Sequence, residues 1–186
     1  MSDLSLEPAS AFSRAGAVGG PSPAALRIEL PARTTVVVAL STMAHAREAS
    51  QRLARVANAH DMLLAAFGPT RWLLVGAAPA GAVIDEIAGL CAGLVSALDQ
   101  SSGRVVVRLC GKPAAEALAK GTAMDLHDAA FPVGRSAPTL LGHFNVQLSR
   151  RAGDVYEIVA TRSYAESVVE GLEDMCREFG YVIAAA

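Results

Sequence analysis

Charged side chains and cysteines are both scarce in this chain of 186 residues. Asp, Glu, Lys and Arg make up 18% of the sequence, against about 25% in an average soluble domain. The three cysteines, Cys91, Cys110 and Cys176, are odd in number and far apart. They therefore indicate neither a disulfide framework nor the closely spaced pairs of a zinc site. Because thiols persist in reducing compartments, we expect a cytoplasmic protein.

Long apolar runs are also lacking, although 52% of the residues are hydrophobic and the mean hydropathy is +0.35. Pro79 and Gly81 interrupt the stretch from Trp72 to Ile84, whereas a helix that spans a bilayer needs about 20 apolar residues. The first residues show no basic start followed by an apolar core, so they do not resemble a signal peptide. An apolar chain without a membrane span favours a subunit that buries surface against a protein partner.

A basic excess is missing too, since the formal net charge is −2 and the pI is about 6.1. Proteins that bind nucleic acid need positive charge to neutralise phosphates, so we expect no nucleic-acid partner. Gly111-Lys112 matches the Gly-Lys pair near the end of a phosphate-loop motif. The motif fails because Val106 stands where a glycine is needed and Pro113 stands where Ser or Thr is needed.

Composition divides the chain into an arm and a domain. Residues 1–24 are rich in Ser, Ala, Gly and Pro and predict a flexible arm, either disordered or ordered against another subunit. Residues 25–186 predict one α+β domain of two similar halves that share a core, each with the order strand, helix, strand or hairpin, helix. The predicted elements are 34–40, 44–58, 71–75 and 79–90 in the first half, and 105–109, 114–120, the hairpin 143–150 with 155–160, and 163–179 in the second.

The last helix has the most complete set of signals. Ser163 and Glu166 have the spacing of a capping box at its start, and Gly180 is placed to end it. Its predicted core face consists of Tyr164, Val168, Leu172, Met175 and Phe179. In the first half, the only tryptophan, Trp72, lies in a short apolar strand and is expected in the core.

Two groups of polar residues could carry chemistry, and each has a plainer structural explanation. Asp125, His127 and Asp128 could bind a metal or move a proton, but such residues are common in loops that hydrogen-bond themselves. Arg151 and Arg162 could bind a carboxylate or an acidic group of a partner, but boundary arginines are often only solvated. Because neither group has a paired acid and base, we predict no catalytic, cofactor-binding or metal-binding residue in this chain.

Five stretches in a fixed order resemble one known family. They are residues 67–74 (FGPTRWLL), 98–101 (LDQS), 104–126 (RVVVRLCGKPAAEALAKGTAMDL), 131–135 (FPVGR) with Thr139, and 161–165 (TRSYA). Their likeness extends over roughly residues 34–179. No stretch is diagnostic alone, but the ordered set resembles the gamma subunit of heterotetrameric sarcosine oxidase.

The resemblance implies a subunit that assembles with alpha, beta and delta subunits and binds no cofactor of its own. FAD, FMN, NAD and zinc would be carried by the other subunits. Such complexes oxidatively demethylate sarcosine to glycine, with hydrogen peroxide and either formaldehyde or methylene-tetrahydrofolate as further products. The implied fold is similar to the folate-binding domain of the glycine-cleavage aminomethyltransferase. The chain departs from the family pattern in its alanine-rich arm and in lacking a proline near residues 62–65.

A second hypothesis is an independent, aminomethyltransferase-like domain that binds folate in one-carbon metabolism. It requires an acidic residue over the pterin, for which Asp125 is the candidate that the sequence offers.

Overall fold

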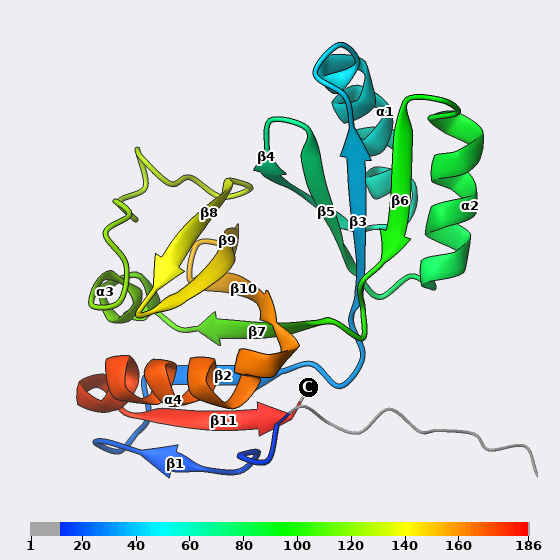
Figure 1. Ribbon diagram of the computed structural model, residues 1–186. Helices are drawn as coiled ribbons and strands as arrows, with labels where there is room; N and C mark the ends of the chain where they lie inside the picture. The colour runs from blue at the N-terminus through cyan, green and yellow to red at the C-terminus, as the bar shows by residue number, and fades with distance from the viewer. Residues whose placement is uncertain (1–11, 186) are drawn as a thin grey trace, which may run out of the picture.

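The computed structural model describes residues 12–185, and its first half is a four-stranded sheet with two helices on one face (Figure 1). The strands lie in the order β4-β5-β3-β6, and every neighbouring pair is antiparallel. The elements are β3 (Thr35–Ser41), α1 (Ala46–Ala59), β4 (Leu63–Gly68), β5 (Arg71–Gly76), α2 (Ala80–Leu90) and β6 (Val95–Asp99).

The second half contains the larger, seven-stranded sheet, in the order β1-β11-β2-β7-β10-β9-β8. Its elements are β7 (Arg104–Cys110), α3 (Ala114–Ala119), β8 (Ser136–Leu141), β9 (Phe144–Ala152), β10 (Val155–Thr161), α4 (Ala165–Cys176) and β11 (Tyr181–Ala185). Short 3₁₀ turns, Arg162–Tyr164 and Arg177–Phe179, flank α4. The N-terminal strands β1 (Val18–Gly19) and β2 (Leu26–Leu30) complete this sheet.

The two halves repeat one arrangement. Strands β7, β9, β10 and β11 with helices α3 and α4 correspond to β3, β4, β5 and β6 with α1 and α2, and in both sheets the first strand pairs with the third. The larger sheet differs by three extra strands: the edge strands β8 and β1, and β2, which lies between β7 and β11 and pairs in parallel with β11. The expected α+β fold of two similar halves is therefore confirmed.

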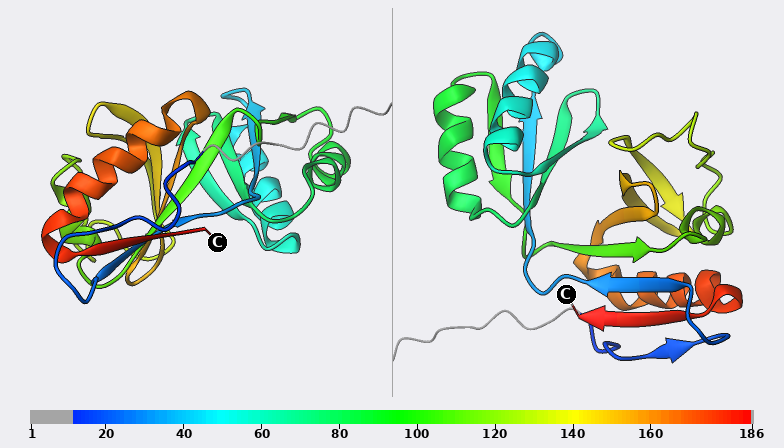
Figure 2. Two further views of the ribbon diagram at one scale, coloured as in Figure 1. Left: turned by 90° about the horizontal axis from the view of Figure 1, so that it is seen from below. Right: turned by 180° about the vertical axis from the view of Figure 1, so that it is seen from behind.

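The described residues form three clusters of buried side chains, of which one joins the two halves. One lies between the small sheet and its helices and includes Trp72 and Leu53, and another lies between the large sheet and its helices and includes Leu172. The third joins the helix-free faces of both sheets, where Leu73 of β5 meets Val106 of β7. Figure 2 shows from behind that α1 and α2 lie on the side of their sheet away from the second half. The shared core is thus a sheet-to-sheet contact.

The start of α4 corrects the predicted capping box. The residue before the helix is Tyr164, and no side chain caps the backbone there. Glu166 instead accepts hydrogen bonds from the backbone N–H and the hydroxyl of Ser13, each at 2.8 Å. Tyr164 was expected in the core but is 48% exposed and lies against the ring of Phe144. The 3₁₀ turn before α4 shifts its first residues out of the helical register on which both predictions depended.

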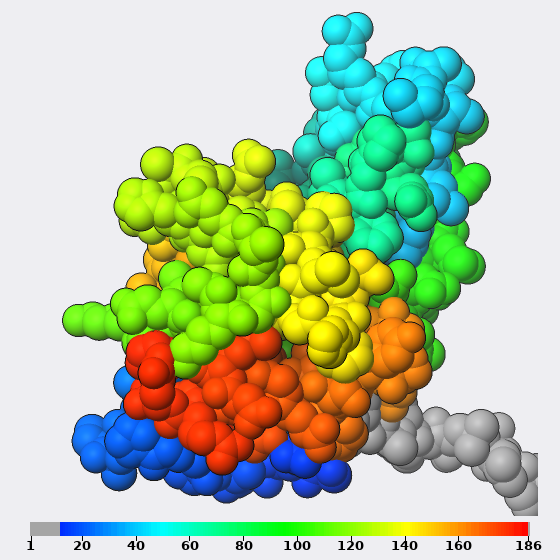
Figure 3. Space-filling model, turned by 60° about the vertical axis from the view of Figure 1, so that its left-hand side comes forward, coloured from blue at the N-terminus to red at the C-terminus, as the bar shows by residue number. Residues whose placement is uncertain are grey.

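The N-terminal arm also differs from the expectation of a flexible segment over residues 1–24. From residue 12 onward it packs against its own chain: Val18 pairs with Val182 of β11, and Arg14 forms ion pairs with Glu166, Glu170 and Glu173 of α4. Figure 3 shows this segment in blue directly below α4. Composition does not reveal this packing, because the ion pairs and the strand pairing join residues that are far apart in the sequence. Residues 1–11 of the predicted arm lie outside the described residues.

Candidate functional site

The loop after α3 contains the first group of candidate residues, and two of them hydrogen-bond within the loop. The carboxylate of Asp125 accepts the backbone N–H of His127 at 2.9 Å, and the ring of His127 accepts the N–H of Ala129 at 3.4 Å. Asp128 binds the guanidinium of Arg150 at 2.6 Å. All three candidate side chains are exposed. Within residues 12–185, no group of three or more His, Cys, Asp or Glu could hold a metal ion.

Arg150 of β9, which the sequence did not single out, holds this loop in place. It is only 7% exposed, and its guanidinium lies over the ring of Tyr156 at 5.5 Å. It donates to the carbonyl oxygens of Phe131 at 3.0 Å and of Gly153 at 2.8 Å. The charge is buried without a large penalty because carbonyl groups, Asp128 and the ring surround it. The FPVGR stretch therefore has an architectural role. The only sign of Arg150 in the sequence was a charged residue within a predicted strand.

The Gly111-Lys112 pair forms a turn, as expected. Gly111 has φ +132°, and a Cβ there would lie 2.3 Å from the carbonyl oxygen of Ala25, so that only glycine fits. Trp72 is 5% exposed and belongs to the core of the first half, as expected. Arg151 is exposed at the β9–β10 turn.

The cysteines are poor nucleophiles in this fold. Burial raises the pKa of the Cys176 thiol to about 12. For Cys110, burial is the main cause and the nearby Glu29 carboxylate adds to it, which raises the pKa to about 11. Burial also raises the pKa of Cys91. Because the thiolate is the reactive form, all three side chains stay protonated and unreactive near neutral pH.

The helix-free face of the large sheet carries a polar row that the sequence did not reveal. Glu157, which is 1% exposed, stands directly opposite Arg108 on one neighbouring strand and Ser149 on the other. One of its carboxylate oxygens accepts from Arg108 Nε at 2.9 Å, and the other has no partner among the described residues. Among residues 12–185, Glu157 pairs with Arg108 and with no histidine or second acid, so its geometry is that of an internal ion pair.

A broad hollow lies where the two halves meet, and we call it the junction cavity. Its volume is about 950 Å³. Its polar lining consists of three arginines, Arg33, Arg104 and Arg162, and four hydroxyl residues, Thr34, Thr35, Ser101 and Ser102. Leu30, Val105 and Ala185 are among its apolar residues. Such a lining suits a carboxylate or another anion. It offers no nucleophile with an adjacent base.

Next to the cavity, two arginines lie against one aromatic ring. The guanidinium carbon of Arg71 is 5.6 Å from the centre of the Phe67 ring, and that of Arg104 is 5.7 Å from it. Leu40 lies directly opposite Arg71 across the β3–β5 ladder. On the other side of β3, Leu98 of β6 lies opposite Val38, two residues along the strand from Leu40. These five residues, Leu40, Phe67, Arg71, Leu98 and Arg104, are called the junction surface below.

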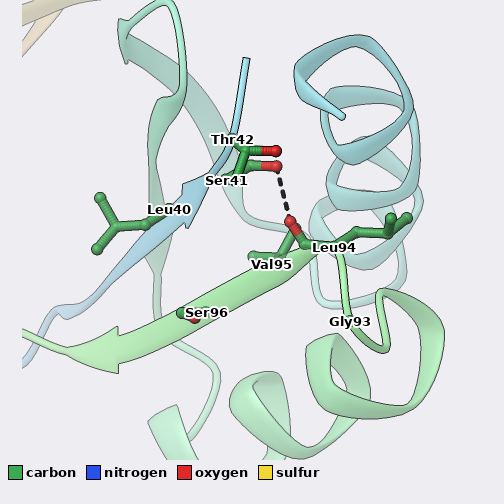
Figure 4. A pocket seen from close by; sticks show the side chains of 7 residues that line it. All are labelled: Leu40, Ser41, Thr42, Gly93, Leu94, Val95 and Ser96. Carbon is green, nitrogen blue, oxygen red and sulfur yellow. Dashed lines mark hydrogen bonds between the residues drawn. The ribbon is translucent and has the colours of Figure 1, made fainter. Parts of the chain in front are cut away.

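A smaller hollow of about 310 Å³ lies where β3 ends and β6 begins (Figure 4). The hydroxyl of Ser41 donates to the carbonyl oxygen of Leu94 at 2.7 Å across its floor. Leu40, at its margin, points away from the helices. The lining contains no charged residue, so this hollow is a weak candidate for a site.

Four of the five stretches that carry the family resemblance meet at this junction. Phe67 and Arg71 come from the first stretch, Ser101 from the second, Arg104 from the third and Arg162 from the last. Asp99 of the second stretch accepts the backbone N–H of Ser101 at 2.9 Å, and Arg162 donates its own N–H to the carbonyl of Gly103 at 3.0 Å. In the sequence these stretches are separate segments, and the fold brings residues from four of them together.

The fold and this junction define a class of protein: an α+β chain of two similar halves. Residues from the stretches that carry the family resemblance gather where the two sheets meet. Comparison with known sequences then gives the family. The chain belongs to the sarcosine oxidase, gamma subunit family, whose sequence model matches residues 16–178. A search of curated proteins found no match.

Solved structures agree with this assignment. A chain of the heterotetrameric sarcosine oxidase from Corynebacterium sp. U-96 is 25% identical, with a TM-score of 0.72 over 87% of this chain and 88% of that one. The glycine cleavage system aminomethyltransferase T from Bartonella henselae has the same fold at 15% identity, with a TM-score of 0.59 over 92% of this chain and 48% of that one. In the described residues, no helix is long and apolar enough to cross a membrane.

Proposed function

We propose that this chain is a structural subunit, without catalytic residues of its own, of a cytoplasmic, heterotetrameric, flavin-dependent sarcosine oxidase. Its partners are the alpha, beta and delta subunits, which carry FAD, FMN, NAD and zinc. The complex converts sarcosine to glycine and hydrogen peroxide, with the one-carbon unit leaving as formaldehyde or as methylene-tetrahydrofolate. In this proposal residues 25–186 act as a single domain.

The family match over residues 16–178 carries the proposal. The local chemistry is consistent with it, because Asp125 and His127 hydrogen-bond within their own loop and Arg150 serves to hold that loop. The residues at the junction are arginines, hydroxyls and leucines, which suit binding to another protein better than proton transfer.

Co-expression with the neighbouring flavin subunits tests the proposal. We expect this chain to co-purify in a yellow complex that produces peroxide from sarcosine. Alanine at Asp125 or at His127 should leave peroxide production per bound flavin unchanged, because acid–base groups typically contribute about 10²–10⁴-fold and neither residue has the partner that such work requires. If either substitution lowered the normalised rate about a hundredfold in an intact complex, this chain would take part in catalysis.

An independent folate-binding domain is the second candidate, and the similarity of fold to aminomethyltransferase T favours it. The acid suggested for it, Asp125, is exposed and already hydrogen-bonded to its own loop. Tetrahydrofolate that bound tightly to a colourless, isolated chain would support this alternative over the structural subunit.

A further inference from the structure

The small sheet has one face that is only partly covered within this chain. Its helices cover one side, and on the other side the β4–β5 region packs against the large sheet through Leu73 and Val75. Val36 and Val38 of β3 also pack there, so the part of this face that is left open is the end of β3 around Leu40 and the strand β6 around Leu98. Leu40 is 40% exposed there and Leu98 is 56% exposed. In the described residues β6 pairs only with β3, so its outer edge is open as well. Adjacent exposed leucines beside an open strand edge are typical of a docking site.

Positive charge borders this open region. Phe67 holds the guanidinium groups of Arg71 and Arg104, which come from different halves of the chain. Neither arginine forms an ion pair with a carboxylate in the described residues, although ten ion pairs occur elsewhere in them. A guanidinium that rests on an aromatic ring keeps its N–H donors for a carboxylate. The chain as a whole has a net charge of −2, so the charge of these two arginines is opposite in sign to that of the whole chain.

We infer that the junction surface docks an acidic segment of a larger subunit of the complex, with carboxylates on Arg71 and Arg104 and apolar side chains on Leu40 and Leu98. This inference rests on the proposed function. A small anion could satisfy the arginines but would leave the leucines exposed, whereas a protein segment covers both. Arginine and apolar side chains are also the groups that interfaces bury at their centres, where a paired charge fixes the orientation of the partner.

The test compares charge reversals at and away from the junction surface in the co-expressed complex. The double variant Arg71→Glu/Arg104→Glu should weaken retention of the flavin subunits about tenfold or more and should reduce the dependence of retention on salt. Arg47→Glu/Arg55→Glu changes the net charge equally on the exposed side of α1 and should match the wild type within about twofold. Leu98→Ser, at a surface position, should weaken retention without changing the salt dependence.

The outcomes separate the inference from the proposed function. If the wild type forms the complex and the Arg71/Arg104 variant forms it equally well, the inference is wrong and the proposed function stands. If the wild type retains no flavin subunit, the proposed function fails and the inference fails with it. If the variant instead converts an isolated dimer to a monomer, a second copy of the chain is the occupant. If it destabilises the isolated chain only when residues 1–11 are present, those residues are the occupant. Either result overturns the inference.

Discussion

Replacement of Leu172 by alanine should be among the most damaging single changes in α4. Leu172 is fully buried in the cluster between the large sheet and its helices. The substitution removes three carbon atoms, which by transfer alone costs about 2.4 kcal/mol. The cavity left in a packed core adds to this, so we expect a loss of about 3–5 kcal/mol in the free energy of unfolding. For a chain of this length the melting temperature should fall by about 10 °C.

Ser163→Ala is the matched control, since both residues lie in the segment that the sequence predicted as one helix. A capping serine would cost about 0.5–2 kcal/mol on removal. Because Ser163 is exposed and no side chain caps α4, we expect a change within about 0.5 kcal/mol. Urea titrations of both variants at constant protein concentration give the comparison. A loss below about 1 kcal/mol for Leu172→Ala, or a larger loss for Ser163→Ala, would refute this description of α4.

Three further predictions concern backbone, pH and reactivity. Gly111→Ala should destabilise the fold by more than about 1 kcal/mol, because the position requires positive φ and a Cβ would approach a carbonyl oxygen. Gly171→Ala, in open space on α4, should stabilise the fold by up to about 1 kcal/mol. If thermal melts showed Gly171→Ala to be less stable than Gly111→Ala, the surroundings described for both glycines would be wrong. Hydrogen bonds from Ser13 lower the pKa of Glu166, so the stabilisation from this contact is present above the usual glutamate pKa of 4.5 and is lost as the pH falls through the lowered value. The protection factors of residues 13–19 against hydrogen exchange, which correct for the pH dependence of intrinsic exchange, should therefore fall in acid for the wild type and already be low in Ser13→Ala. Equal protection in the two proteins at neutral pH would argue against the contact. Cys176 should resist iodoacetamide at pH 7.5 until denaturant is added, because its pKa is about 12, and fast labelling of the native protein would disprove its burial.

Elements with a strong local pattern were predictable, whereas those defined by distant partners were not. The valine-rich strand β7 and helix α1, with its apolar face at helical spacing, lie within two residues of the predicted limits. Strands β4 (LLAAFG) and β11 (YVIAA) were missed because alanine and glycine weaken both the alternation and the strand propensity. Their strand conformation comes from the sheets into which they insert.

The junction illustrates the same limit for the candidate site. Arg162 was recognised as a possible site for an acidic partner, and it does line the junction cavity. Arg71 and Arg104 were not singled out, because each looks like an ordinary charged residue at a strand start. Both guanidinium groups lie against the ring of Phe67 because β4 contacts the beginning of β7. No spacing in the sequence encodes that contact.

The position of β2 between β7 and β11 has a consequence for biosynthesis. Among the described strands, β2 leaves the ribosome near the beginning and β11 at the very end, yet the two must pair in parallel along their whole length. All strands of the small sheet lie within residues 35–99, so this sheet can close while translation continues, whereas β2 keeps an open edge until its last neighbour arrives. A nascent or truncated chain that ends before residue 181 therefore presents an unprotected strand to its neighbours on the polysome, where a chaperone or early capture by a partner subunit would have the most effect.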